Sequence, residues 1–292
     1  MLLDDSFLRK LSTLKLVTHR ARVGQAAGER RSTRRGTSVE FADYRDYTRG
    51  DDLRHVDWNI YARLERPYVK LFEEEEDLAV HILLDGSGSM NWGVGEENKW
   101  LWARRMAAAL GYIALAGGDL LTVTTICRPQ PVAFGPVRGQ VSTLRLFEWL
   151  ETLKAEGTTD LNAALRACAL SGRRVGLTIL ISDMFSPTGF ADGLTALAAS
   201  GHELTLVHVL APDEIDPPFG GDLRLLDVEG GVPQEVTVDA GVLALYRRRL
   251  AAWQEEIRAV CRARDVRYLA GATEVPLERI ILYEMRRTGL VK

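Results

Sequence analysis

A carboxylate and two hydroxyls close an apolar run early in the chain. Asp85, Ser87 and Ser89 follow the run from Val80 to Leu84, and a glycine separates each polar residue from the next. Carboxylate and hydroxyl oxygens at this spacing are hard ligands of the kind that Mg²⁺ or Mn²⁺ prefers. A glycine- and serine-containing loop whose aspartate caps a helix would have the same composition. The segment alone leaves a metal site and an ordinary loop as open alternatives.

Two later segments carry similar groups. Thr158 and Thr159 lie between two stretches of helical character, and either could add a hydroxyl ligand. A second apolar run, residues 177–182, is followed directly by Asp183. In an open parallel sheet, ligands gather outside the carboxyl ends of the strands. We therefore expect Asp85 and Asp183 to lie close together, although they are far apart in the sequence.

Apolar strands alternate with helical stretches of ten or more residues from residue 78 onwards. This alternation predicts βα units, and the nearly unbroken apolar strands indicate a sheet that is covered on both faces. The predicted fold class is α/β, with a doubly wound, mostly parallel sheet of Rossmann-like type. The expected strands span 78–85, 120–127, 132–134, 175–183, 204–210 and 266–269, and the expected helices span 99–117, 141–154, 160–170, 190–200 and 240–264, with a last helix opening at Pro276.

Three segments depart from this alternation. Residues 222–238 predict an inserted β-hairpin around two adjacent glycines. Residues 1–37 are rich in basic side chains, and apolar residues recur at helical spacing between residues 4 and 20. We expect residues 1–37 to form a basic helix followed by a mobile segment, and residues 78–292 to form the main α/β domain.

Residues 38–77 interleave aspartate, arginine and aromatic residues more closely than a solvent-facing helix would. We expect this segment to pack on the main domain through arginine–carboxylate pairs and buried rings. Phe41, Tyr44 and Trp58 are the rings that we expect to be largely buried, and Arg54 is expected to pair with a nearby aspartate.

Composition excludes several classes of protein. The chain has 292 residues and a net charge of −3, so no overall field attracts it to nucleic acid. Cys127, Cys168 and Cys261 form no Cys-x-x-Cys pair, which indicates reduced thiols and no zinc site. No apolar run reaches the length of a membrane span, and the N-terminus has no secretory signal pattern. We expect a cytoplasmic protein without a specific nucleic-acid site or a transmembrane segment.

The sequence Gly50-Asp-Asp-Leu-Arg-His-Val-Asp-Trp58 resembles a motif of the bacterial domain-of-unknown-function-58 family. That family joins the motif to a von Willebrand factor type A domain, and the resemblance covers roughly residues 36–290. The ordered set Asp-x-Ser-x-Ser, Gly-x-Thr-Asp and Ile-x-Ser-Asp is similar to the metal-ion-dependent adhesion site of type A domains, with Thr159 at the matching threonine. The resemblance implies one Mg²⁺ or Mn²⁺ held by Asp85, Ser87, Ser89, Thr159 and Asp183, with the serines bound directly and the aspartates often through water.

The same resemblance implies a non-enzymatic function. In type A domains the ion bridges to an acidic residue of a partner protein. Family members are commonly encoded beside MoxR-type AAA+ ATPases, so we expect an adaptor or co-chaperone of such an ATPase. Trp92, on the loop after the metal motif, is our candidate for a partner contact. A ring folded back over the sheet edge is the alternative.

Two other functions stay open at this point. One is a metal-dependent hydrolase that acts on phosphate esters through the same ion. The other is a binder of anionic surfaces that acts through residues 1–37. The sequence contains no nucleotide-binding loop, zinc-protease motif or serine-hydrolase elbow, which favours the binding function over an enzyme.

Overall fold

The chain divides into two compact units, and each is described by itself. Residues 1–22 and 78–292 form the α/β unit, and residues 23–77 form the small unit. The computed structural model describes residues 2–18, 39–48, 50–51, 53–74, 78–127, 131–225 and 233–292. The basic segment that we expected to be mobile after the first helix lies outside the described residues.

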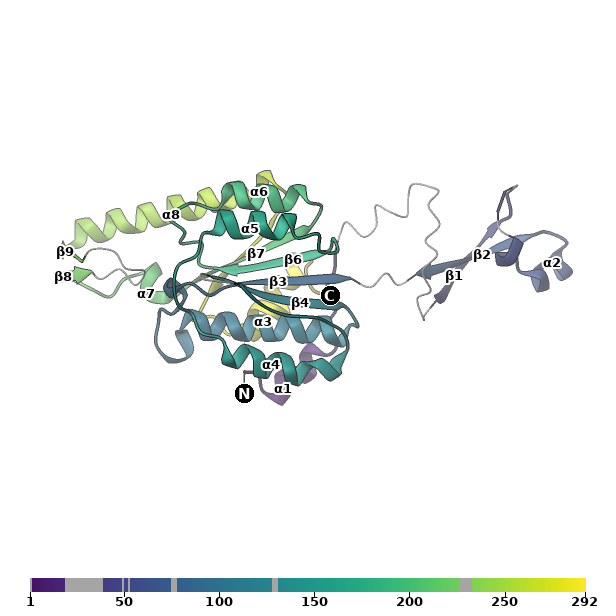
Figure 1. The fold of residues 1–292 in the computed structure, drawn as a ribbon, viewed down its shortest axis with the longest axis horizontal. Coiled ribbons are helices and arrows are strands. Elements are labelled where there is room, and N and C mark those ends of the chain that lie inside the picture. The colour runs from purple at the N-terminus through teal and green to yellow at the C-terminus, as the bar shows by residue number, and fades with distance from the viewer. Residues whose placement is uncertain are drawn as a thin grey trace. The chain divides into compact units, whose positions relative to one another are not determined.

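A six-stranded sheet forms the centre of the α/β unit (Figure 1). Neighbouring strands are parallel except for β5, which runs antiparallel to β4. The predicted fold class, a doubly wound and mostly parallel α/β sheet, is confirmed. In spatial order the strands are β10 (Arg267–Ala272), β7 (Glu203–Leu210), β6 (Leu177–Ser182), β3 (Ala79–Asp85), β4 (Leu120–Ile126) and β5 (Val132–Val137).

Helices cover both faces of this sheet (Figure 1). Successive side chains of a strand point to opposite faces, which explains why the sequence of β3 is apolar at nearly every position. Ile82 and Leu84 belong to the core under α1, α3 and α4, whereas Leu83 belongs to the core under α5, α6 and α8. The first layer contains α1 (Asp5–Leu11), α3 (Lys99–Ala116) and α4 (Thr143–Thr152), and the second contains α5 (Leu161–Leu170), α6 (Ala191–Ala199) and α8 (Ala240–Ala263).

The first helix is shorter than the predicted span of residues 4–20. α1 ends at Leu11, and the chain then becomes extended. Leu14 and Leu16 are buried on either side of an exposed residue, a period of two that fits a strand. Leu16 forms an antiparallel bridge with Val291. The apolar spacing that we interpreted as one long helix therefore combines a short helix with a strand-like segment that pairs with the C-terminal end.

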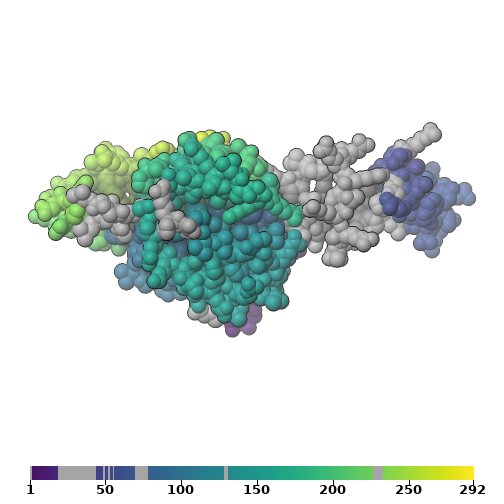
Figure 2. All heavy atoms as spheres, in the orientation of Figure 1, coloured from purple at the N-terminus to yellow at the C-terminus, as the bar shows by residue number. Residues whose placement is uncertain are grey.

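The hairpin predicted near residues 222–238 is present as β8 (Gly221–Leu225) and β9 (Gln234–Val238). It leads into α8, whose 24 residues span about 36 Å. The strand after α8, β10, has only six residues and spans about 20 Å. The first half of α8, the hairpin and the short helix α7 (Pro212–Ile215) therefore extend past the carboxyl edge of the sheet (Figure 1). In the space-filling view, the hairpin and the start of α8 project from the unit at the left (Figure 2).

Short elements complete the α/β unit. Three-residue 3-10 helices lie at Gly88–Met90, Gly95–Glu97 and Gln140–Ser142, and the C-terminal part contains α9 (Leu277–Arg279), a π-helix (Ile280–Glu284) and α10 (Met285–Arg287). Among the helices that the structure describes, none has both the length and the apolar composition needed to cross a membrane.

The small unit contains β1 (Val39–Asp46), a 3-10 helix (Leu53–His55), α2 (Trp58–Leu64) and β2 (Tyr68–Glu74). β1 and β2 pair antiparallel. Asp57 is buried and caps α2, because its carboxylate accepts the N–H groups of Asn59 and Ile60 at 2.9 and 3.2 Å. The hydroxyl of Tyr44 donates to the same carboxylate at 3.1 Å.

Packing within this unit does not bury Trp58 or Tyr44, and their burial against the α/β unit stays a prediction. The side chain of Trp58 is 58% exposed and that of Tyr44 is 38% exposed. The interior position goes to Asp57, because the free N–H groups at the start of a helix need an acceptor. The side chain of Phe41 lies outside the described residues. The packing of residues 38–77 on the α/β unit stays a prediction.

Candidate metal centre at the carboxyl edge of the sheet

The candidate site lies at the topological switch point of the sheet. β3 pairs with β4 on one side and with β6 on the other. Open α/β sheets bind ligands in the crevice outside the carboxyl ends of two such strands. Asp85 is the last residue of β3, and Asp183 directly follows β6. The fold therefore places both carboxylates at the ends of neighbouring strands.

Asp85 is fully buried, and donors reach both of its carboxylate oxygens. Oδ1 accepts the hydroxyl of Thr159 at 3.0 Å and the N–H of Ser87 at 3.1 Å. Oδ2 accepts the hydroxyl of Ser182 at 2.6 Å. We had not predicted Ser182 as a site residue. These bonds offset the cost of removing a carboxylate from water.

The hydroxyls of Ser87 and Ser89 face each other. Their Oγ atoms are 3.0 Å apart, and Ser87 is buried whereas Ser89 is partly exposed. The N–H of Gly88 donates to the carbonyl of Gly157 at 2.8 Å, which fastens the serine loop to the loop that carries the predicted threonine. Four of the five predicted donors are thus joined in one hydrogen-bonded cluster.

A buried lysine that the sequence analysis missed joins the fifth donor, Asp183, to a third carboxylate. The side chain of Lys99 is fully buried. Its ammonium donates to Asp183 Oδ2 at 2.7 Å and to Glu214 Oε1 at 2.6 Å. Glu214 lies in α7, and its Oε2 accepts the N–H of Ala211 at 2.9 Å. The structure therefore places an ion pair on one side of the predicted metal centre.

Local sequence signals could have indicated this ion pair. Lys99 opens α3, although a positive charge is unfavourable at the N-terminal end of a helix. Its neighbours Trp100 and Trp102 are apolar, so the helix begins with a lysine inside an apolar segment. Glu214 follows the predicted strand 204–210 and therefore lies at the same edge of the sheet.

Aromatic side chains enclose the Asp183 side of the site. The ring of Phe185 stacks on Trp253 with centroids 4.9 Å apart, and the Lys99 ammonium lies 5.2 Å from the Phe185 centroid. His208 packs edge-on against Trp253, and its Nε2 lies 3.2 Å from the carbonyl oxygen of Asp183. Apolar surroundings of this kind strengthen the attraction between the buried charges.

Two buried groups have strongly shifted pKa values. Burial, followed by the charge of Asp183, raises the pKa of Asp85 to about 6. Burial lowers the pKa of His208 to about 4. Burial also raises the pKa of Glu214 above its usual range, against the opposing effect of Lys99.

These shifts predict opposing pH effects on the stability of the metal-free protein. Because the pKa of Asp85 is raised in the folded protein, Asp85 contributes to the free energy of unfolding at low pH. This contribution is fully present below pH 3.8, the usual pKa of an aspartate, and is lost as the pH rises through about 6. Because the pKa of His208 is lowered in the folded protein, its contribution to the free energy of unfolding is fully present above pH 6.5. This contribution is lost as the pH falls towards about 4. In the wild type the two contributions offset each other between these limits.

Asp85→Asn should therefore lose stability more steeply than the wild type as the pH falls from 6.5 to 4, because the Asp85 contribution that opposes the His208 effect is removed. Urea unfolding at a series of pH values measures this slope. An Asp85→Asn profile parallel to that of the wild type would show that Asp85 titrates in the folded protein as it does in the unfolded chain.

The chemical type of the donor atoms at the site suits a small divalent cation. In the described part of the chain, no group of three or more His, Cys, Asp or Glu side chains could hold a metal ion. A cation at this edge would therefore depend on hydroxyl oxygens beside two carboxylates. The 3.0 Å between Ser87 Oγ and Ser89 Oγ matches the separation of about 3 Å between adjacent ligands around Mg²⁺. All these donors are oxygens, which suits Mg²⁺ or Mn²⁺.

Trp92 lies on the loop between the serine cluster and α3. Its side chain is 39% exposed, and its carbonyl oxygen accepts the N–H of Lys99 at 2.8 Å. The loop that carries this exposed ring is thus attached to the lysine that pairs with Asp183. The role of Trp92 as a partner contact stays a prediction.

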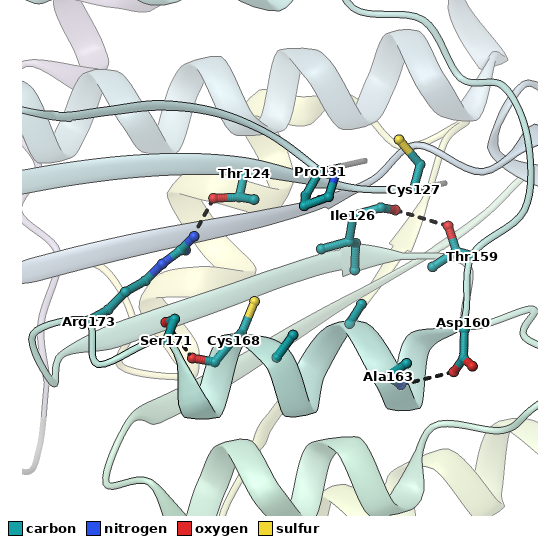
Figure 3. Close-up of a pocket in the computed structure, with 12 residues that line it drawn as sticks. Thr124, Ile126, Cys127, Pro131, Thr159, Asp160, Ala163, Cys168, Ser171 and Arg173 are labelled. Carbon is teal, nitrogen blue, oxygen red and sulfur yellow. Dashed lines mark hydrogen bonds between the residues drawn. The ribbon is translucent and has the colours of Figure 1, made fainter. Parts of the chain in front are cut away.

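A cavity of about 340 Å³ lies beside the site, between α5 and β4 (Figure 3). Thr159 lines the cavity and also donates to Asp85. Figure 3 shows Arg173 at the opposite end of the lining, where it donates to Thr124 Oγ1 at 3.2 Å. Alanines of α5, among them Ala163, form the wall between these ends. The cavity therefore adds apolar surface next to the candidate metal centre.

An open α/β sheet with hydroxyls and carboxylates at its switch point is the architecture of a ligand-binding α/β domain. The chain belongs to the family described as "Protein of unknown function DUF58", whose profile matches residues 43–256. An uncharacterised protein of Mycobacterium tuberculosis (strain H37Rv) is 28% identical over 263 residues, which is 89% of this chain and 82% of that protein. An uncharacterised protein of Mycobacterium avium is 34% identical over 104 residues, which is 36% of this chain and 61% of that protein.

Two solved structures are similar to this chain. The conserved hypothetical protein BatB from Bacteroides thetaiotaomicron has a TM-score of 0.46 and 16% identity, and covers 73% of this chain and 98% of its own. An aerotolerance-related membrane protein from Bacteroides fragilis has a TM-score of 0.44 and 15% identity, and covers 72% of this chain and 97% of its own.

Proposed function

We propose that the chain is a non-enzymatic protein-binding module that depends on a divalent cation. Asp85, Ser87, Ser89, Thr159 and Asp183 would hold Mg²⁺ or Mn²⁺. When bound, the ion would supply a positive charge that attracts an aspartate or glutamate of a partner protein. The observation that carries the proposal is the hydrogen-bonded group of Asp85 and its hydroxyls at the switch point of the sheet.

Each residue of the site would have a distinct role in holding the ion. Ser87 and Ser89 present two hydroxyl oxygens at the spacing of adjacent ligands. Asp85 supplies charge from beneath them and is held in place by Ser182. Thr159 fixes the second loop against the first by donating to Asp85. The site is thus ordered before a partner arrives, which lowers the entropic cost of binding.

The resemblance to type A domains suggests the class of partner. In those domains the ion bridges to a carboxylate of another protein. Family members are commonly encoded beside MoxR-type AAA+ ATPases. We therefore propose that the partner is such an ATPase or its client. The exposed ring of Trp92 and the cavity beside Thr159 would provide apolar contacts around the bridging ion.

The surroundings of the site favour binding over hydrolysis. His208 is the histidine whose ring contacts the backbone of Asp183, and both of its nitrogens already have partners, since Nδ1 lies 2.9 Å from the Tyr268 hydroxyl. Its pKa of about 4 also makes it a weak base. A hydrolase of phosphate esters remains the second candidate, because oxygen-bound Mg²⁺ or Mn²⁺ can also activate water.

The two candidates predict different outcomes for one preparation of the protein. As an adaptor, the immobilised chain should retain an AAA+ ATPase from bacterial lysate in Mg²⁺, release it in EDTA, and fail to retain it as Ser87→Ala. As a hydrolase, it should turn over p-nitrophenyl phosphate with Mg²⁺ or Mn²⁺, and Asp85→Asn should abolish the turnover. We expect the first result, and reproducible turnover that Asp85→Asn abolishes would overturn the adaptor.

A further inference from the structure

The Lys99 ammonium is bonded to a carboxylate that the proposed cation would also use. Its distance to Asp183 Oδ2 is 2.7 Å, that of a strong charge-assisted hydrogen bond. Neither side chain of the pair has any exposed surface. The positive charge of Lys99 therefore already neutralises Asp183, one of the two carboxylates of the site.

Local structure does not account for this position of Lys99. The residue begins α3, where the positive end of the helix dipole repels an ammonium. Burial of a charge is costly unless opposite charges compensate it. The compensation comes from Asp183, from Glu214 and from the face of Phe185. Lys99 is therefore held here by tertiary contacts with the site.

Glu214 gives the ammonium a second partner away from the metal donors. Lys99 Nζ is 2.6 Å from Glu214 Oε1, and the Glu214 side chain is 14% exposed. The carbonyl of Glu214 also accepts the hydroxyl of Tyr246, at 2.6 Å, so α7 is fastened to α8. An ammonium displaced from Asp183 could thus remain paired with Glu214.

On the basis of the proposed function, we propose that the ammonium of Lys99 competes with the divalent ion for Asp183. In the metal-free protein its ammonium neutralises Asp183, and ion binding shifts the ammonium towards Glu214. The competition lowers the affinity for the ion alone. It also reduces the negative charge that a partner carboxylate meets at the occupied site. Lys99 is thus a residue that sets ion affinity without being a ligand.

The proposal predicts that two substitutions shift ion affinity in opposite directions. Lys99→Met removes the competing charge and should tighten Mn²⁺ binding by roughly tenfold or more. Glu214→Gln leaves Lys99 with Asp183 as its one fully charged partner in this group, and should weaken Mn²⁺ binding by roughly threefold or more. The matched control is Lys154→Met, which removes the charge of a lysine whose side chain is 79% exposed and should leave Mn²⁺ affinity unchanged.

Mn²⁺ titration of the full chain, followed by the loss of the free Mn²⁺ electron-paramagnetic-resonance signal, measures these affinities. A pH of 8 keeps carboxyl groups well above their usual pKa range. Thermal unfolding with and without Mn²⁺ gives a second readout, and Mn²⁺ should raise the Tm of Lys99→Met more than that of the wild type. A merely structural lysine would lower the Tm of the variant without a larger Mn²⁺ effect.

The outcomes separate this inference from the proposed function. Asp85-dependent Mn²⁺ binding in the wild type, with equal or weaker binding in Lys99→Met, would overturn the inference and leave the metal site standing. Binding in Lys99→Met but not in the wild type would support the competition in its strongest form. Absence of binding in both would overturn the inference and the metal site together. If Lys99→Met does not fold, weaker binding in Glu214→Gln supports the inference and unchanged binding overturns it.

Discussion

Lys99→Met is expected to lower the free energy of unfolding of the metal-free protein by about 3 to 5 kcal/mol. The substitution keeps most of the side-chain volume but removes the ammonium that pairs with Asp183 and Glu214. Two carboxylates are then left without their cation, one of them fully buried and the other nearly so. Removing one partner of a buried ion pair costs far more than the pair itself contributes, because the remaining charge stays in an apolar environment.

Urea unfolding in EDTA, followed by circular dichroism, measures this loss. The control is Lys10→Met, because Lys10 pairs with Glu278 at a similar distance of 2.6 Å while both side chains are about half exposed. Water screens that surface pair, so the control should change stability far less than Lys99→Met does. Equal small effects of both substitutions would mean that the Lys99 pair is not buried in solution.

The second large effect is expected at Gly176, where β6 begins beside β3. A Cβ atom at this position would lie 2.1 Å from the carbonyl oxygen of Ala79 and 2.9 Å from its carbonyl carbon. Backbone atoms cannot move aside as the end of a flexible side chain can, so the two strands would have to separate. Gly176→Ala should therefore cost about 3 kcal/mol or more, at the upper end of overpacking effects.

Gly220→Ala is the matched control for this prediction. The nearest atom to a Cβ at Gly220 is 3.9 Å away, which is ordinary contact, so stability should change by less than about 0.5 kcal/mol. Because β3 and β6 end in Asp85 and Ser182, separation of the strands should also disturb the hydrogen bond between these side chains. Denaturant unfolding of both variants tests the expectation, and a neutral Gly176→Ala would contradict the close approach of the strands.

The sequence predicted the sheet and the ends of its strands because both have local causes. The residues of β3 and β6 are mostly apolar on both faces, so each strand is a nearly continuous apolar run that ends at polar residues. Parallel connection then places Asp85 and Asp183 at one edge, whatever their separation in the chain. The hairpin, predicted from its two adjacent glycines, and the long helix that follows it are also present.

The remaining parts of the site depend on tertiary contacts, for which the sequence carries at most an indirect signal. Lys99 is an unusual first residue for a helix in an apolar segment, but only the position of α7 shows that Glu214 is its partner. Ser182 stands beside a predicted ligand, but only the pairing of β3 with β6 directs its hydroxyl to Asp85. Within the small unit, the buried position at the start of α2 belongs to the capping Asp57 and Trp58 is exposed, so any burial of Trp58 would also need a tertiary contact outside this unit.

Calorimetric titration of the full chain with Mg²⁺ and with Mn²⁺, in the wild type, Asp85→Ala and Asp183→Ala, tests the central claim most directly. The proposed metal centre predicts a single site in the wild type that both substitutions weaken by about tenfold or more, because each removes a carboxylate from the ion's surroundings. Thermal unfolding of each variant verifies that it is folded before the titration. Equal heats and equal affinities in the wild type and both folded variants would show that any bound ion lies elsewhere, and would contradict a metal centre at the carboxyl edge of the sheet.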